Sequence, residues 1–225
     1  NCVDRHIEGP DRNKAAILWE GEPGETRVLT YQDVYREVCK FANGLKSIGI
    51  QKGDRVAILA HNCAEVFELE FACGKIGGVE LPLNWRLTKP ELEYILNDSD
   101  PMCLIYTIEF EAIAQELIRD CEIKNSLMIE ENNYGSEYET AILENNDFEI
   151  VESNHDDLIM LMYTSGTTGH PKGAMINHQM QFFNTVNLGA TARITDKTIQ
   201  LVVLPLFHTC LLYTSDAADE GLGVD

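Results

Sequence analysis

Hydrophobic residues recur along this chain in two alternating patterns. Short continuous apolar runs, such as residues 55–60 and 158–163, are typical of strands that are covered on both faces. Between these runs, apolar residues recur every three or four positions, which is the spacing of one face of a helix. The first pattern predicts strands over residues 15–19, 26–30, 55–60, 102–106, 126–129, 158–163, 174–176 and 199–204.

Helices are predicted in the intervening stretches. Thr30 and Thr88 have the hydroxyl group expected of a helix N-cap, and Gly49 and Gly77 are typical of helix C-termini. Repeated strand–helix–strand units with continuous apolar strands predict an α/β fold, with parallel sheets flanked by helices. The predicted helices lie between Thr30 and Gly49, over about 64–76, after Thr88, over about 109–119 and over about 178–192.

The charge of the chain is strongly acidic and unevenly distributed. The 37 acidic and 17 basic residues give a formal net charge of −20. Such a surface repels phosphate backbones and anionic lipid, so we expect no nucleic-acid partner. Residues 108–157 contain 15 acidic and 2 basic residues, whereas residues 158–209 contain 1 acidic and 3 basic residues. This net-positive segment is where an anion is bound most easily.

Two further features of the sequence indicate the cellular compartment of the protein. The apolar runs are too short to cross a bilayer, and no basic stretch followed by an apolar one opens the sequence, so we expect a cytoplasmic protein without a transmembrane segment. The seven cysteines include no pair with CxxC spacing and mostly fall within apolar patterns. We therefore expect buried, reduced thiols rather than disulfides or metal ligands.

One segment has the composition of a phosphate-binding loop. Four hydroxyl residues, three glycines and a lysine lie together after the strand predicted at 158–163. Glycines let backbone N–H groups turn inward, hydroxyls add donors and lysine adds positive charge, which together suit a polyphosphate; composition alone also fits a flexible connector. A Walker A loop is excluded, because Gly173 rather than Ser or Thr follows Lys172. The segment reads Thr164-Ser165-Gly166-Thr167-Thr168-Gly169-His170-Pro171-Lys172-Gly173.

The stretch 161–173 resembles the AMP-binding signature of the adenylate-forming superfamily along its whole length. Residues 53–57, Gly-Asp-Arg-Val-Ala, and residues 204–208, Leu-Pro-Leu-Phe-His, are similar to two further segments of that superfamily in the expected order. The resemblance covers residues 1–209 and implies a partial N-terminal domain of the adenylate-forming enzyme fold. Its members include acyl-CoA synthetases, adenylation domains of peptide synthetases and luciferases.

The resemblance also implies roles for individual residues. The loop would hold the β- and γ-phosphates of ATP, and Thr164 would contribute to binding Mg²⁺. His208 matches a His or aromatic residue near the acyl pocket of the family, the alternative being that it merely ends a strand. The implied catalytic residues are Lys172, Thr167 and His208, and the implied ATP-binding residues are Thr164, Ser165, Gly166, Thr167, Thr168, Gly169 and Lys172.

The implied reaction joins a small-molecule carboxylic acid to ATP. The acid attacks the α-phosphorus, pyrophosphate leaves, and the thiol of coenzyme A then takes the acyl group from the acyl-adenylate and releases AMP. Residues 61–107 and 201–208 are similar to fatty-acyl-CoA ligases of medium to long chain, whereas residues 1–47 are more similar to acetyl-CoA synthetases. We expect a fatty acid as substrate and an inactive fragment. Alternatives are a short-chain ligase, a domain that loads a carrier protein, a luciferase-like oxygenase, a non-enzymatic nucleotide-binding module, and two related genes joined near residues 50–60.

The last sixteen residues differ from the pattern of the family. Residues 210–220, Cys-Leu-Leu-Tyr-Thr-Ser-Asp-Ala-Ala-Asp-Glu, resemble the translation of a transposon-type sequencing adapter, and the similarity continues through residue 225. We therefore expect a native segment 1–209 and a non-native tail 210–225, the alternative being a short acidic tail of biological origin.

Overall fold

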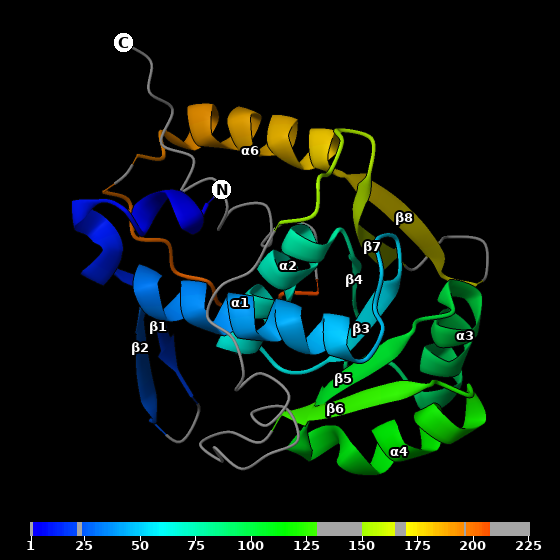
Figure 1. The fold of residues 1–225 in the computed structure, drawn as a ribbon. Helices are drawn as coiled ribbons and strands as arrows, with labels where there is room; N and C mark the ends of the chain where they lie inside the picture. Colours follow the sequence, from blue (N-terminus) through cyan, green and yellow to red (C-terminus); the bar gives the residue numbers. More distant parts are fainter. Residues whose placement is uncertain (1, 22–23, 130–149, 165–169, 196, 208–225) are drawn as a thin grey trace.

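The computed structural model describes residues 2–21, 24–129, 150–164, 170–195 and 197–207. These residues form a six-stranded sheet with helices on both faces, and a separate two-stranded hairpin near the N-terminus (Figure 1). The α/β fold expected from the hydrophobic pattern is therefore confirmed.

Most elements agree with the predicted ranges to within one or two residues. The strands are β1 (Ala15–Glu20), β2 (Thr26–Thr30), β3 (Arg55–Leu59), β4 (Val79–Pro82), β5 (Cys103–Thr107), β6 (Asn125–Ile129), β7 (Leu158–Thr164) and β8 (Lys172–Asn177). The α-helices are α1 (Tyr31–Ser47), α2 (Ala64–Ile76), α3 (Lys89–Ser99), α4 (Glu111–Asp120) and α6 (His178–Ala192). Short 3₁₀ turns cover Asp4–His6, Pro10–Asn13 and Ile108–Phe110.

The strand order of the large sheet is β6-β5-β3-β4-β7-β8. The first five strands in this order are parallel to one another, as predicted, whereas β8 is antiparallel to β7. Residues 165–171 join β7 to β8, and this connection is too short for a parallel crossover, which needs about a dozen residues. The chain therefore turns back on itself at the segment that resembles the AMP-binding signature.

The helix ends follow from local hydrogen bonds. Thr30 caps α1 in a reciprocal capping box with Asp33, and Thr88 caps α3 in the same way with Glu91. Gly77 ends α2 in the left-handed conformation, with φ of 71°, which favours glycine. The N-caps predicted at Thr30 and Thr88 are thus confirmed.

The strands of the structure differ from the predicted ones in two places. The sequence pattern missed β4, because Glu80 and Pro82 interrupt its apolar run. The strand predicted over 199–204 is wrong: the described residues 197–207 contain no strand, and Ile199 and Leu201 are more than 80% exposed. In the described part of the chain this segment pairs with no strand, and the carbonyl oxygen of Leu204 and the N–H of Leu206 are instead hydrogen-bonded to the side chain of Asn62.

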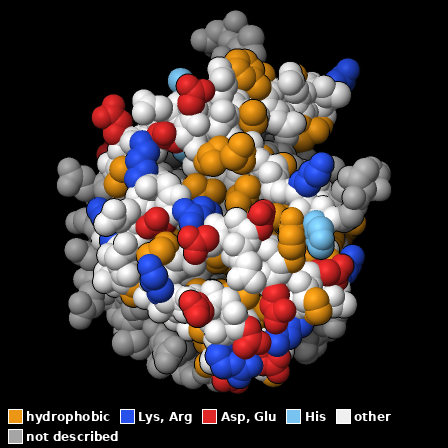
Figure 2. Space-filling view, turned by 90° about the vertical axis from the view of Figure 1, so that its right-hand side faces the viewer, with side chains coloured by type: hydrophobic (Ala, Val, Ile, Leu, Met, Phe, Trp, Pro, Cys, Tyr) orange, Lys and Arg blue, Asp and Glu red, His pale blue; other side chains and the backbone are white. Residues whose placement is uncertain are grey.

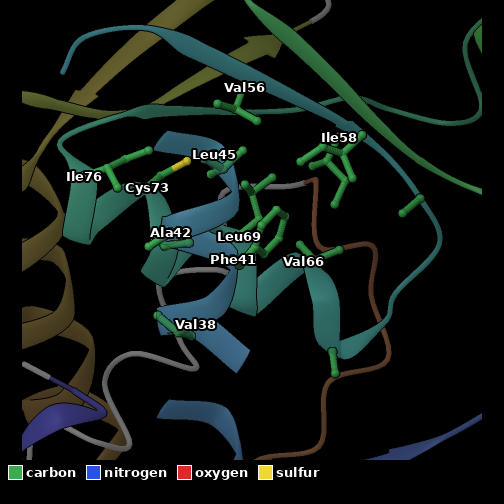
Figure 3. Close-up of a cluster of buried hydrophobic side chains, with 14 of the residues drawn as sticks. Val38, Phe41, Ala42, Leu45, Val56, Ile58, Val66, Leu69, Cys73 and Ile76 are labelled. Carbon is green, nitrogen blue, oxygen red and sulfur yellow. The ribbon is translucent and has the colours of Figure 1, made fainter. Parts of the chain in front are cut away.

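The core consists of two layers of apolar side chains, one on each face of the sheet. On one face α1 and α2 pack over β3, and the fully buried Phe41, Leu45 and Leu69 fill the space between them (Figure 3). On the other face α3 and α4 cover β3, β4 and β5, and Leu92 and Leu117 are fully buried there. Burying each such side chain contributes roughly 2 kcal/mol to stability.

Most of the cysteines that the structure describes are buried, as expected. Six of them are free, and four of these are buried: Cys39, Cys63, Cys73 and Cys103. Burial raises the pKa of Cys103 to about 12 and that of Cys63 and Cys73 well above the usual value, so these thiols stay protonated. Cys210 lies outside the described residues.

Candidate active site

The topology brings the carboxyl ends of several strands to one edge of the sheet. Because β3, β4, β5 and β7 are parallel, the residues that follow them all emerge at this edge. In open α/β sheets, ligands bind in the crevice outside the carboxyl ends of the strands. The segment that resembles the AMP-binding signature begins here, at the end of β7.

Two of the predicted site residues lie opposite each other at this edge. Thr164 is the last residue of β7 and Lys172 the first of β8, and they form the final pair of the antiparallel ladder. Both side chains are exposed, and within the described part of the chain no acidic side chain forms an ion pair with Lys172. The lysine charge at the base of the loop is therefore available to an anion.

The other predicted site residues are not placed by the structure. Ser165, Gly166, Thr167, Thr168, Gly169 and His208 lie outside the described residues. Their roles remain predictions from the signature.

Gly173 allows β8 to pass close to a side chain of β7. It pairs with Tyr163 in the ladder, and a Cβ atom at residue 173 would lie 2.9 Å from Leu161 Cδ1 and 3.2 Å from Tyr163 Cζ. The Tyr163 ring therefore lies across the glycine backbone, which fixes the direction of both strands where the loop begins and ends.

Replacing Gly173 by alanine should destabilise the hairpin by about 1–3 kcal/mol, because the added methyl group would displace Tyr163 and Leu161. The measurement is the melting temperature of the full-length enzyme that contains this chain. Ala174→Ser is the matched control, since Ala174 is the next residue of β8 and is exposed. A Gly173→Ala protein as stable as wild type would show that the close approach imposes no constraint.

Asn62 connects the end of β3 to the segment that precedes His208. Its Nδ2 donates to the carbonyl oxygen of Leu204 at 2.7 Å, and its Oδ1 accepts from the N–H of Leu206 at 2.9 Å. Its own carbonyl oxygen accepts from Trp19 Nε1 at 2.9 Å. No sequence motif predicted this role of Asn62, although an asparagine three residues after a buried parallel strand is a signal that could have pointed to it.

Aromatic side chains from three strand ends gather beside Asn62. His61 makes edge-to-face contacts with Trp85 and Phe110 at centroid distances of 4.6 and 4.9 Å, and its Nδ1 lies 3.1 Å from Glu109 Oε1. Trp85 also makes an edge contact with Phe207, the residue before His208. Asn62 and this aromatic packing hold the Leu204–Phe207 end of the segment at the same edge of the sheet as Thr164 and Lys172.

A separate cavity of about 340 Å³ lies between the N-terminal segment, α2 and α6. Its lining includes Lys75, His155 and His178 but none of the predicted site residues. The residues that resemble the family signature lie at the strand ends, so the cavity is not the site they predict.

The described residues also limit what the site can hold. Among them no group of three or more His, Cys, Asp or Glu side chains could hold a metal ion. The hydroxyl of Thr164 fits Mg²⁺, because this ion binds hard oxygen ligands and usually takes only one or two from protein, the others coming from water and substrate phosphates. None of the helices in the described part of the chain is long and apolar enough to cross a membrane.

Comparison with known proteins agrees with the site. Residues 3–215 match the family model of the AMP-binding enzymes. The chain is 39% identical over 184 residues to feruloyl-CoA synthase of Amycolatopsis sp, covering 82% of this chain and 35% of the relative. It is 34% identical over 198 residues to acetyl-coenzyme A synthetase of Gemmatimonas aurantiaca, covering 77% of this chain and 30% of the relative.

The fold is similar to a solved structure as well. A protein assigned as a long-chain-fatty-acid CoA ligase from Rhodopseudomonas palustris superposes with a TM-score of 0.84 at 26% identity, over 98% of this chain and 54% of that one. The chain spans about a third of the length of the curated relatives it matches. Its signature segment, strand order and sequence similarity together show that the chain belongs to the AMP-binding enzyme family.

Proposed function

We propose that the full-length enzyme containing this chain activates a carboxylic acid with ATP and transfers the acyl group to coenzyme A. The main support for the proposal is the position of residues 164–172, which begin at the carboxyl end of β7 and end at the exposed Lys172. Sequence similarity to acyl-CoA synthetases supports it.

The chemistry requires two anions to meet. The carboxylate of the acid attacks the α-phosphorus of ATP, the bond to the pyrophosphate oxygen breaks, and the pyrophosphate leaves with the electron pair. Catalysis therefore depends on neutralising charge and on holding the reactants in line. Lys172 supplies a positive charge at the base of the loop, and Thr164 supplies a hydroxyl oxygen suited to Mg²⁺, which would neutralise phosphate charge when bound.

Within the carboxylic acids, we propose a fatty acid of medium or long chain. Residues 61–107 and 201–208 support this substrate by their similarity to fatty-acyl-CoA ligases, and so does the fold of the Rhodopseudomonas palustris protein. The feruloyl and acetyl relatives make an aromatic acid and acetate the alternatives.

Acid-dependent exchange of pyrophosphate into ATP tests the proposal. The full-length enzyme is expected to exchange pyrophosphate with acids between C6 and C18 and to be slower with acetate and ferulate. Preference for ferulate or acetate would overturn the fatty-acid assignment alone. An enzyme that binds ATP but shows no exchange with any acid would be a nucleotide-binding module instead. Residues 1–209 alone are expected to give no exchange.

The native segment is proposed to end at Thr209, with residues 210–225 as a non-native tail. The tail lies outside the described residues, and the family match extends to residue 215, into its first part. Sequencing the genomic locus decides the matter, because a genomic reading frame that encodes residues 210–225 would contradict the proposal.

A further inference from the structure

Helix α3 lies beside the end of the β7–β8 hairpin from which the loop emerges (Figure 1). The face of the molecule that carries α3 and α4 has acidic and basic side chains mixed along its lower part (Figure 2). Two side chains of α3, Tyr94 and Asp98, contact residues that flank the loop. They are four positions apart and so lie on one side of the helix.

The first contact is a hydrogen bond to the residue before the loop. The hydroxyl of Tyr163 donates to Asp98 Oδ2 at 2.5 Å. Partial burial, together with the neighbouring Asp98 carboxylate, raises the pKa of Tyr163 above its usual value, so the hydroxyl keeps the proton that it donates. The ring of Tyr163 is also held against Gly173 of the opposite strand. Asp98 thereby fixes the hairpin one residue before Thr164.

The second contact is a ring stack on the other side of the loop. His170 lies parallel to Tyr94, with ring centroids 4.6 Å apart and an interplanar angle of 18°. His170 precedes Lys172 by two residues. Such a stack contributes about 0.5–1.5 kcal/mol beyond the area it buries. Tyr94 therefore fixes the chain where it returns to β8.

Helix α3 is itself firmly held. Its apolar side chains Leu92, Ile95 and Leu96 are buried against the sheet. At its N-terminus, Lys89 Nζ lies 2.9 Å from Glu116 and 2.7 Å from Asp120 of α4. The helix can therefore serve as a fixed support for both ends of the loop.

We propose that Tyr94 and Asp98 are positioning residues for the ATP loop. The inference rests on the proposed function, since Tyr163 and His170, the residues that α3 contacts, flank the segment proposed to hold the phosphates. A displacement of about 1 Å in reacting groups can cost a hundredfold in rate, so fixing both ends of a glycine-rich loop matters for catalysis. Neither residue needs to touch ATP, because each acts through Tyr163 or His170.

The test compares single variants and one double variant of the full-length enzyme. Tyr163→Phe and Asp98→Ala remove the same hydrogen bond, and Tyr94→Leu removes the stack. Each is expected to raise the dissociation constant for ATP and the KM for ATP about tenfold, while the KM for the acid and for coenzyme A stays within twofold. Tyr94→Phe keeps a ring and should behave like wild type. Combining Tyr163→Phe with Asp98→Ala should add nothing further, because the single hydrogen bond is already lost.

Asn97→Ala is the matched control, since Asn97 is exposed on the same helix between the two residues. Calorimetric titration with ATP in the absence of any acid separates the proposed activation of an acid from the proposed role of α3. If the wild-type enzyme binds ATP but exchanges no pyrophosphate, the activation of an acid is refuted. The role of α3 is then still tested by the ATP affinity of the variants. Unchanged ATP affinity in both Tyr163→Phe and Tyr94→Leu overturns the role of α3, and so does a wild-type enzyme that binds no ATP. An equal loss for ATP, acid and coenzyme A would indicate general unfolding and would also overturn it.

Discussion

Replacing Lys172 by alanine should lower the rate of acid-dependent pyrophosphate exchange by about a hundredfold or more, the effect typical of removing one group that stabilises transition-state charge. Lys172 is exposed at the base of the loop, and no ion pair with an acid holds it in the described part of the chain. It lies in the net-positive segment of an otherwise acidic protein, where few carboxylates are present to repel an anion. The loss should appear mainly in kcat, because the charge on the phosphates grows as pyrophosphate leaves.

Two further variants make the Lys172 result specific. Lys172→Arg keeps the positive charge and should retain more activity than alanine, although its planar head group cannot occupy the same point. Lys197→Ala removes another exposed lysine from the same net-positive segment and should leave the rate unchanged. If Lys172→Ala exchanged pyrophosphate as fast as wild type, the lysine would have no part in the mechanism.

The elements of the fold could largely be predicted because they depend on local patterns. The bounds of α2 and α6 agree with the predicted ranges, since Gly77 ends the first and Asn177 caps the second. The four-residue strand β4 could not be predicted from its own pattern. It is a strand because β3 and β7 pair with it on both sides, and this information comes from residues far away in the chain.

The site could be predicted only where it depends on a contiguous signature. Thr164 and Lys172 lie together because a short hairpin joins their strands. Asn62 and Leu204 are 142 positions apart in the sequence, and Tyr163 and Asp98 are 65 apart, so no local pattern reveals either contact. Such pairs follow from the strand order of the sheet, which the hydrophobic pattern does not determine.

A second large effect is expected at Glu80, in the middle of β4. This glutamate is fully buried, and neither carboxyl oxygen has a hydrogen-bond partner among the described residues. It pairs with Val56 of β3 and Met160 of β7, and the buried thiol of Cys73 on α2 lies near it. Burial away from water raises the pKa of Glu80 to about 8, so the side chain is protonated in the folded protein at neutral pH.

The direction in which stability changes with pH follows from comparing the protonation of Glu80 in the folded and in the unfolded chain. Below about pH 4.5, Glu80 is protonated in both the folded and the unfolded chain, and it adds no pH dependence. Between about pH 4.5 and pH 8 the unfolded chain loses this proton while the folded chain keeps it, which stabilises the unfolded state. The free energy of unfolding should therefore fall as pH rises through this window, and the fall should stop above the folded pKa.

Glu80→Gln should remove this fall, because glutamine has a similar shape and cannot ionise. The variant and the wild type should be about equally stable at pH 4.5, and at pH 8 the variant should be more stable by on the order of 4 kcal/mol, since one pKa unit corresponds to about 1.4 kcal/mol. The measurement is the melting temperature of both full-length proteins across this range. Glu20→Gln is the matched control, because Glu20 also lies in a strand but is exposed. A difference between Glu80→Gln and wild type that stays constant with pH would mean that Glu80 is already ionised in the folded protein, and that a cation or water compensates its charge within the sheet.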